Sequence, residues 1–333
     1  MKNKDYEKRR RKRLFYLLIC LFITGVTLTT SSYAWFTSNR LVRIDLLNVK
    51  VRAEGGIEIS ADGTNWKSIL STNDLESASD NYPSSVNQIP LVLEPISTAL
   101  ELEDGKLKMF HGIAENNSSG KYVLSLKRSI EESSFGENSN GKFIAFDLFL
   151  KTSSDMRLYL TPESNAVYAG DTSYGIENAV RYAFVYEGNT PSGSTLPVIQ
   201  GLSTNDNDNV YIWEPNYNVH TESAIANAYN VYGINTFNGD NALSYDGASN
   251  SVDSSLGIII DNAKASMYPE YFKTVDVDYK SVGAFTENIE IFTLKSGVSK
   301  IRVYMWIEGQ DVDCENNASV GDISFNLQFT TNP

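Results

Sequence analysis

Hydrophobic and polar residues alternate with a period of two over most of the chain from residue 42 onward. Such alternation is the pattern of β-strands that bury one face. It predicts an all-β protein whose core is supplied mainly by four long segments. In each of them the apolar side chains share a face: Ile144, Phe146, Leu148 and Leu150; Val180, Tyr182, Phe184 and Tyr186; Ile301, Val303, Met305 and Ile307; Ile323, Phe325, Leu327 and Phe329.

Turn residues between the alternating segments predict how the strands connect. Residues 56–69 are expected to form a hairpin with Asp62–Gly63 at its turn. A second hairpin is expected over residues 288–309, turning at Ser296–Gly297. Residues 156–160 read as a short strand that pairs with the long strand before it. The sequence thus predicts antiparallel pairing between strands that are neighbours along the chain.

The segment 41–51 changes the phase of its alternation. Its apolar positions are even-numbered up to Leu46 and odd-numbered from Leu47. A bulge or sharp bend between these two residues would restore a continuous apolar face.

Helix signals are few. Thr221 is expected to cap one short helix, and residues 174–180 to form another. The polar stretches 71–87 and 237–255 read as long loops, because strand pattern resumes after each of them. We therefore predict a single antiparallel β-sandwich domain over residues 35–333, with long polar loops and one or two short helices.

The first 34 residues have the organisation of an export signal. A basic segment, 1–13, precedes the apolar run Leu14–Leu28, and Ser32-Tyr33-Ala34 follows as a small-x-Ala pattern. Residues 1–34 are therefore predicted to be a signal peptide, cleaved between Ala34 and Trp35. The chain is expected to work outside the cell or at its surface.

An uncleaved N-terminal membrane anchor is the alternative for the same residues. The basic segment would stay in the cytoplasm, and Trp35 and Phe36 would lie at the outer membrane interface. The apolar run is short for a membrane-spanning helix, which needs about 20 apolar residues. In both cases the bulk of the chain faces outward.

The charge of the predicted mature chain is strongly negative. The whole sequence has 28 basic and 41 acidic residues, of which residues 1–34 hold eight basic and two acidic ones. The remainder carries 20 against 39. Because a nucleic acid is bound by basic surface, this balance argues against a nucleic-acid partner.

Residues suited to catalysis are sparse. His111 and His220 are the only histidines, and after the leader Cys314 is the only cysteine. We find no nucleophile elbow, phosphate-binding loop or zinc motif. Cys314 is expected to be a small buried hydrophobic residue, and the protein is not expected to be an enzyme.

The densest cluster of polar residues follows the segment 297–307. Glu308, Asp311 and Asp313 lie within six residues, and closely spaced carboxylate oxygens are ligands for Ca²⁺. An ordinary solvated acidic turn is the other interpretation. Apart from calcium at this position, no cofactor is predicted.

The stretch Tyr33-Ala34-Trp35-Phe36-Thr37-Ser38-Asn39 resembles the leader junction of exported fibre proteins of the TasA and camelysin type. The resemblance implies a leader processed by a dedicated signal peptidase of the SipW type, a jelly-roll β-sandwich and assembly into biofilm matrix fibres. Camelysin-type members have been described as metalloproteases, but this sequence has no zinc motif. The resemblance is specific over about 10 residues and architectural beyond them.

The start of the predicted mature chain suggests how subunits would join. Trp35 and Phe36 are awkward to leave in water, so the segment from Trp35 to Leu41 is expected to insert into a neighbouring subunit. Residues 42–51 are expected to complete the sandwich of their own chain. No hydrophobic tail or cell-wall sorting signal follows Phe329, so a cleaved chain should be held by its neighbours or released.

Two functions are carried forward from the sequence. The first is an exported cell-surface or biofilm-matrix structural protein, with self-association through the N-terminal segment and a signal peptidase as partners. The second is a monomeric surface adhesin or glycan-binding sandwich, anchored by an uncleaved helix. Cell-wall or matrix glycans would then stack on exposed aromatic side chains. Tyr182, Tyr186, Tyr304 and Trp306 lie on predicted strands, where packing in the core is the more economical interpretation, and both interpretations stay open.

Overall fold

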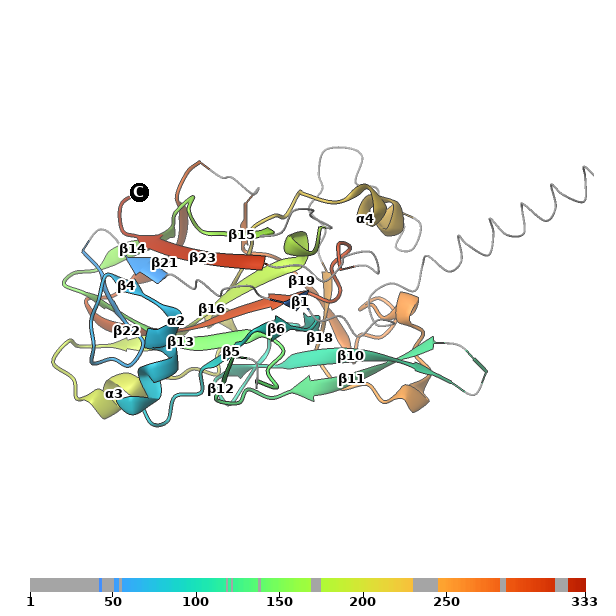
Figure 1. Cartoon of the computed structure of the whole chain (residues 1–333), viewed down its shortest axis with the longest axis horizontal. Coiled ribbons are helices and arrows are strands. Elements are labelled where there is room, and N and C mark those ends of the chain that lie inside the picture. Colours follow the sequence, from blue (N-terminus) through green and yellow to red (C-terminus); the bar gives the residue numbers. More distant parts are fainter. Residues whose placement is uncertain are drawn as a thin grey trace, which may run out of the picture.

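The computed structural model describes residues 42–43, 51–53, 56–117, 119–120, 122–136, 139–168, 175–229, 245–281, 286–314 and 323–333. Strands dominate these residues, and the few helices have three to six residues each. The predicted all-β class is therefore confirmed, and Figure 1 shows the strands stacked in layers.

The central sheet contains the longest strands, and its middle three are antiparallel. Their order across the sheet follows the path β12–β5–β13–β22–β16–β17–β20, with β3 paired to β13. The bounds are β12 Ser134–Gly136, β5 Gln88–Pro90, β13 Ile144–Thr152, β22 Gly297–Ile307, β16 Val180–Thr190, β17 Val210–Glu214, β20 Tyr279–Lys280 and β3 Glu58–Ser60.

A second sheet faces the central one and completes a sandwich (Figure 1). The buried core between them contains the four apolar faces expected from the sequence, with Tyr186 packed at its margin. The sandwich and its core residues are thus confirmed. The second sheet consists of β21 Ile289–Leu294, β14 Met156–Leu160, β23 Ile323–Thr330, β2 Val51–Ala53 and β4 Ile69–Leu70, with β15 Asn165–Tyr168 paired to β23.

Two of the expected strand pairs are wrong. β14 does not pair with β13, and β21 does not pair with β22; instead β13 pairs with β22 and β14 with β21. The β13–β14 connection and the β21–β22 connection each cross from one sheet to the other, and they contact each other. The Asp155 carboxylate of the first accepts hydrogen bonds from Ser296 N at 2.9 Å and Lys295 Nζ at 3.0 Å of the second. Period-two alternation reports which face of a strand is buried but not which strand lies beside it.

The turn at Asp62–Gly63 also leads from one sheet to the other. Ile59 and Lys67 form a single antiparallel bridge across the turn. The strand before the turn, β3, pairs in the central sheet, and the strand after it, β4, pairs in the second sheet. The expected hairpin is therefore correct only near its turn.

The outer face of the central sheet is covered by a third layer, seen in Figure 1 as β10 and β11 on the side opposite β23. All eleven residues of β22 are consequently buried. The small sheets and pairs outside the sandwich are β10 Met109–Asn116, β11 Tyr122–Ser129 and β7 Ile96–Ser97; β18 Tyr245–Ala248 and β19 Phe272–Val275; β8 Leu102–Glu103 and β9 Lys106–Leu107; β1 Val42–Arg43 and β6 Val92–Leu93.

The helices are short, and two lie in a predicted loop. Thr221 caps α4, since its hydroxyl accepts a hydrogen bond from Ala224 N at 3.1 Å. The second expected helix is the 3₁₀ helix η2. Residues 71–87 are not simply a loop, because they contain α2 and η1, and β18 lies within residues 237–255. The bounds are α2 Thr72–Glu76, η1 Ser77–Asp80, η2 Ile176–Ala179, α3 Leu196–Gln200, η3 Asn207–Asn209, α4 Glu222–Asn227, η5 Ser254–Leu256 and η6 Ile260–Asn262.

The two described pieces of the segment 41–51 both pair within their own chain. β1 pairs with β6, and β2 lies between β23 and β4. Val51 thus belongs to the sandwich as expected, whereas Val42 and Arg43 pair with β6 outside it, and residues 44–50 lie outside the described residues. The predicted bulge at Leu46–Leu47, the cleavage site Ala34–Trp35 and the assembly segment Trp35–Leu41 lie outside the described residues.

The predicted leader, residues 1–34, also lies outside the described residues. None of the helices that the structure describes has the length and apolar character needed to span a membrane.

Candidate functional site

The acidic cluster expected after β22 lies inside the protein. Glu308 and Asp313 are 0% and 1% exposed, and the side chain of Asp311 is 6% exposed. The interpretation as an ordinary solvated turn is therefore wrong. A sequence of alternating carboxylates could not reveal this, because the turn is buried by residues far away in the chain, among them Ile96, Arg181 and His220.

Arg181 of β16 is the cation of this cluster. Its fully buried guanidinium lies 2.5 Å from Asp311 Oδ2 and 2.8 Å from Glu214 Oε1. Although burial opposes the charged form, the two carboxylates raise the pKa of Arg181 above its ordinary value. A paired arginine thus joins β16, β17 and the turn after β22.

The other two predicted carboxylates also have protein partners. Trp306 Nε1 donates to Glu308 Oε2 and Gln310 N donates to Oε1, both at 3.0 Å. His220 Nδ1 lies 2.6 Å from Asp313 Oδ2, and Thr221 N donates to Asp313 Oδ1 at 3.0 Å. These contacts fasten the turn to β22 and to the residues that begin α4.

Burial makes three carboxylic acids of this cluster weaker acids. It raises the pKa of Glu308 to about 7, and it also raises the pKa values of Glu214 and Asp313. Such groups are candidates for proton binding near neutral pH. Among the residues that the structure describes, no group of three His, Cys, Asp or Glu side chains is arranged to hold a metal ion. Calcium binding by Glu308, Asp311 and Asp313 stays untested, and the protein partners that already contact these carboxylates argue against it.

A second buried ionic network, which the sequence did not predict, lies on the outer face of the central sheet. Arg302 of β22 contacts Asp147 Oδ1 through Nη1 and Glu131 Oε2 through Nη2, each at 2.6 Å. Tyr304 donates to Glu131 Oε1 at 2.6 Å, and Tyr82 donates to Asp147 Oδ2 at 2.9 Å. In the sequence, the one residue that could have indicated this network was Asp147, a lone carboxylate inside a mostly apolar strand.

Lys300 extends this network, and its ammonium group is fully surrounded by acceptors. It lies 2.7 Å from Glu187 Oε2 and 3.3 Å from Asp147 Oδ2, and it donates to the carbonyl oxygen of Leu202 at 3.0 Å. Burial disfavours the ammonium, but these carboxylates raise the pKa of Lys300 above its usual value. A lysine held in its charged form is not a nucleophile, so this network fits a structural role.

The remaining candidates from the sequence are also accounted for by packing. Tyr182, Tyr304 and Trp306 are fully buried and offer no stacking surface to a glycan, whereas Tyr186 is partly buried against the core. Cys314 is a buried thiol, as expected.

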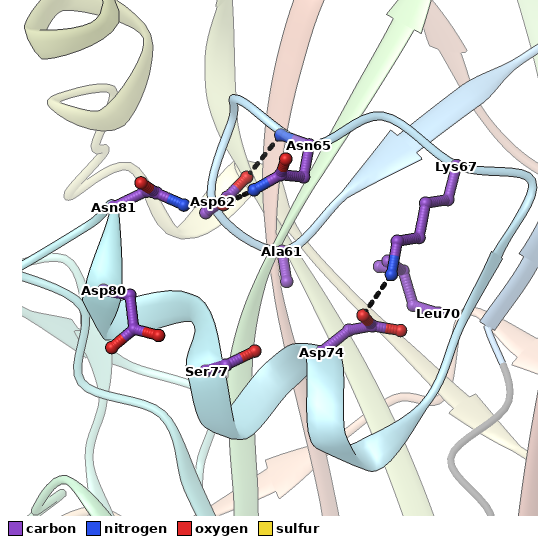
Figure 2. A pocket seen from close by; sticks show the side chains of 9 residues that line it. All are labelled: Ala61, Asp62, Asn65, Lys67, Leu70, Asp74, Ser77, Asp80 and Asn81. Carbon is purple, nitrogen blue, oxygen red and sulfur yellow. Dashed lines mark hydrogen bonds and ion pairs between the residues drawn. The ribbon is translucent and has the colours of Figure 1, made fainter.

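A polar cavity of about 280 Å³ lies beside the turn at Asp62–Gly63, a region without a site prediction (Figure 2). The turn supplies one wall, and α2 with η1 supplies the other. The lining residues are Ala61, Asp62, Asn65, Lys67, Leu70, Asp74, Ser77, Asp80 and Asn81.

Comparison with known proteins identifies no relative: no protein-family model, no curated protein and no solved structure matches this chain. The described residues form an all-β sandwich with two buried ionic networks and small polar cavities, of which the one beside Asp62 is shown in Figure 2.

Proposed function

We propose that this chain is an exported structural protein of a bacterial cell surface or biofilm matrix, built to self-associate. The observation that carries the proposal is the position of β1 and β2. Both pair within the folded domain, so the aromatic segment Trp35–Leu41 directly precedes the first described strand in the sequence. The leader pattern of residues 1–34 and the resemblance to TasA-type and camelysin-type proteins support the same role.

The described interior is consistent with a scaffold. Its buried charged side chains contact side chains of opposite charge or hydrogen-bond donors, as Arg302 does with Glu131 and Asp147, and both sheets contribute residues to its core. A sandwich of this size is stabilised by its apolar core, since the mature chain has one cysteine and no intramolecular disulfide can form.

Self-association is tested by comparing two forms of the protein. The form that begins at Trp35 should polymerise into fibres visible by electron microscopy, whereas the form that begins at Leu41 should stay folded and monomeric. Equal polymerisation of both forms would eliminate the role of residues 35–40. Unfolding of the shorter form would show that this segment belongs to its own core.

Export is tested by N-terminal sequencing of protein extracted from the cell surface. A terminus at Trp35 is expected, with Ala34 as the last residue of the leader. A terminus at Met1 or Lys2 would instead support the anchored form.

A monomeric adhesin or glycan-binding module is the second candidate function. The polar cavity of Figure 2 favours it, because this cavity offers hydrogen-bonding side chains at the protein surface. Monomers retained on a glycan array, without fibres, would support this function over the first.

A further inference from the structure

The cavity beside Asp62 has a polar ring and a small apolar floor. Figure 2 shows side chains from the turn and from α2–η1 arranged around Ala61, with Leu70 behind Lys67. Its volume of about 280 Å³ is near the lower limit of small-ligand pockets, which is about 300 Å³. A ligand that fits must therefore be small and rich in polar groups.

Hydrogen bonds hold the ring in place. The Asp62 carboxylate accepts from Thr64 N and Asn65 N at 2.8 Å each, and from the side-chain amides of Asn65 at 2.7 Å and Asn81 at 3.0 Å. Gln200 of α3 donates through Nε2 to the carbonyl oxygens of Asp62 at 2.7 Å and Asn81 at 3.0 Å. A ligand would therefore meet a preorganised surface, which lowers the entropy cost of binding.

These bonds also decide which groups remain for a ligand. Asn65 and Asn81 each direct a side-chain N–H to Asp62, so their amide oxygens remain as acceptors. Lys67 is paired with Asp74. The carboxylate of Asp80 is exposed and makes no ion pair or hydrogen bond with the described residues. The ring thus offers mainly acceptors, which suit a ligand with several hydroxyl donors.

We propose that this cavity binds one uncharged sugar unit, free or at the end of a polysaccharide. The hydroxyls would donate to Asp80 and to the two amide oxygens of Asn65 and Asn81. Three aspartates against one lysine disfavour an acidic sugar. This proposal does not depend on polymerisation. It deepens the second candidate function, because it names the cavity as the site at which a surface glycan would bind.

Saturation-transfer NMR on the full chain tests the proposal with a panel of neutral monosaccharides and one uronic acid. Transfer to at least one neutral sugar and none to the uronic acid is expected. Asp80→Ala should weaken binding about tenfold or more, as for a lost hydrogen bond to a charged group. Ser77→Phe, which fills the cavity from α2–η1, should abolish binding.

Glu76→Ala is the matched control, because Glu76 is an exposed carboxylate of α2 that does not line the cavity. Circular dichroism would verify that every variant folds, and fibre formation by Asp80→Ala should equal that of the parent. No transfer to any neutral sugar, or equal binding by Asp80→Ala and Glu76→Ala, would overturn the proposal. A calcium-induced rise in melting temperature that Asp80→Ala abolishes, without a sugar response, would assign the cavity to a cation and overturn it too.

Discussion

At the scale of single residues, the buried charges are stable because each has an opposite charge or a hydrogen-bond donor within reach. Arg302 is 3% exposed and holds two carboxylates, Asp147 and Glu131, that are also buried. Arg302 and Asp147 stabilise each other's charged form, so the pKa of Asp147 lies below its usual value despite burial. Removing Arg302 would leave these two buried carboxylates with weaker compensation, from Lys300 and Lys106 at 3.3 Å each.

We therefore expect Arg302→Met to lower the free energy of unfolding by about 3 kcal/mol, since Asp147 and Glu131 lose their nearest cation and keep only the longer contacts with Lys300 and Lys106. Urea denaturation measures the change. Arg157→Met is the control, because Arg157 forms an exposed pair with Glu290 and its loss should leave the midpoint nearly unchanged. Similar midpoints for both variants would contradict a stabilising role for the network.

Glu308 should make stability depend on pH. Burial raises its pKa from 4.5 to about 7 in the folded protein, so the folded state binds the proton more tightly than the unfolded state. Its contribution to stability is complete below about pH 4.5 and is lost as the pH rises through about 7. Between these values the unfolding free energy of the parent should fall relative to that of Glu308→Gln. Parallel pH curves for the two proteins would rule out this assignment.

At the scale of elements, the crossings between sheets require specific backbone geometry. Gly297 begins β22 directly after the crossing from β21 and has a φ of +121°. A Cβ at this position would lie 2.3 Å from the carbonyl oxygen of Thr190 on β16. Only glycine allows both the turn and the close approach of the neighbouring strand.

Gly297→Ala is accordingly expected to destabilise the protein by more than about 2 kcal/mol, through backbone strain and a steric clash. Gly257→Ala is a matched control with a φ of +65° and no atom within 4 Å of the added Cβ. It should cost only about 1 kcal/mol, the strain of the left-handed region. Thermal unfolding would compare the stabilities of the two variants, and an equal loss of stability in both would show that the contact with Thr190 is unimportant.

At the scale of the whole molecule, the central sheet is buried on both faces, by the second sheet on one side and by the β7–β10–β11 layer and the β18–β19 pair on the other. The acidic cluster lies at the end of β22 beneath residues from β16, β17 and the start of α4. Its carboxylates are bound to protein donors, so an added cation would have to displace them.

Millimolar calcium or a chelator is therefore expected to leave the melting temperature unchanged. Differential scanning fluorimetry checks this, because a ligand that binds the folded state raises the melting temperature by mass action. A rise with calcium that disappears in Asp311→Asn would restore the calcium site at Glu308, Asp311 and Asp313.

The sequence by itself determined the long strands of the sandwich and their core-facing residues, but not β10 and β11 of the outer layer. Alternation is a local property, and a strand must turn the same side chains to any apolar surface it meets. For this reason the inward faces of β13, β16, β22 and β23 were predicted from the sequence. The cap of α4 by Thr221 was predictable for the same reason, because an N-cap involves only residues next to each other.

Only the tertiary structure decided the strand partners and the ionic networks. β13 and β14 are adjacent in sequence, yet the crossing at Asp155 places them in different sheets. The burial of Glu308, Asp311 and Asp313 depends on residues more than 90 positions away, such as Arg181 and His220. The cavity beside Asp62 depends likewise on Gln200. Contacts of this kind leave no periodic trace in a sequence, because they join side chains that only the folded chain brings together.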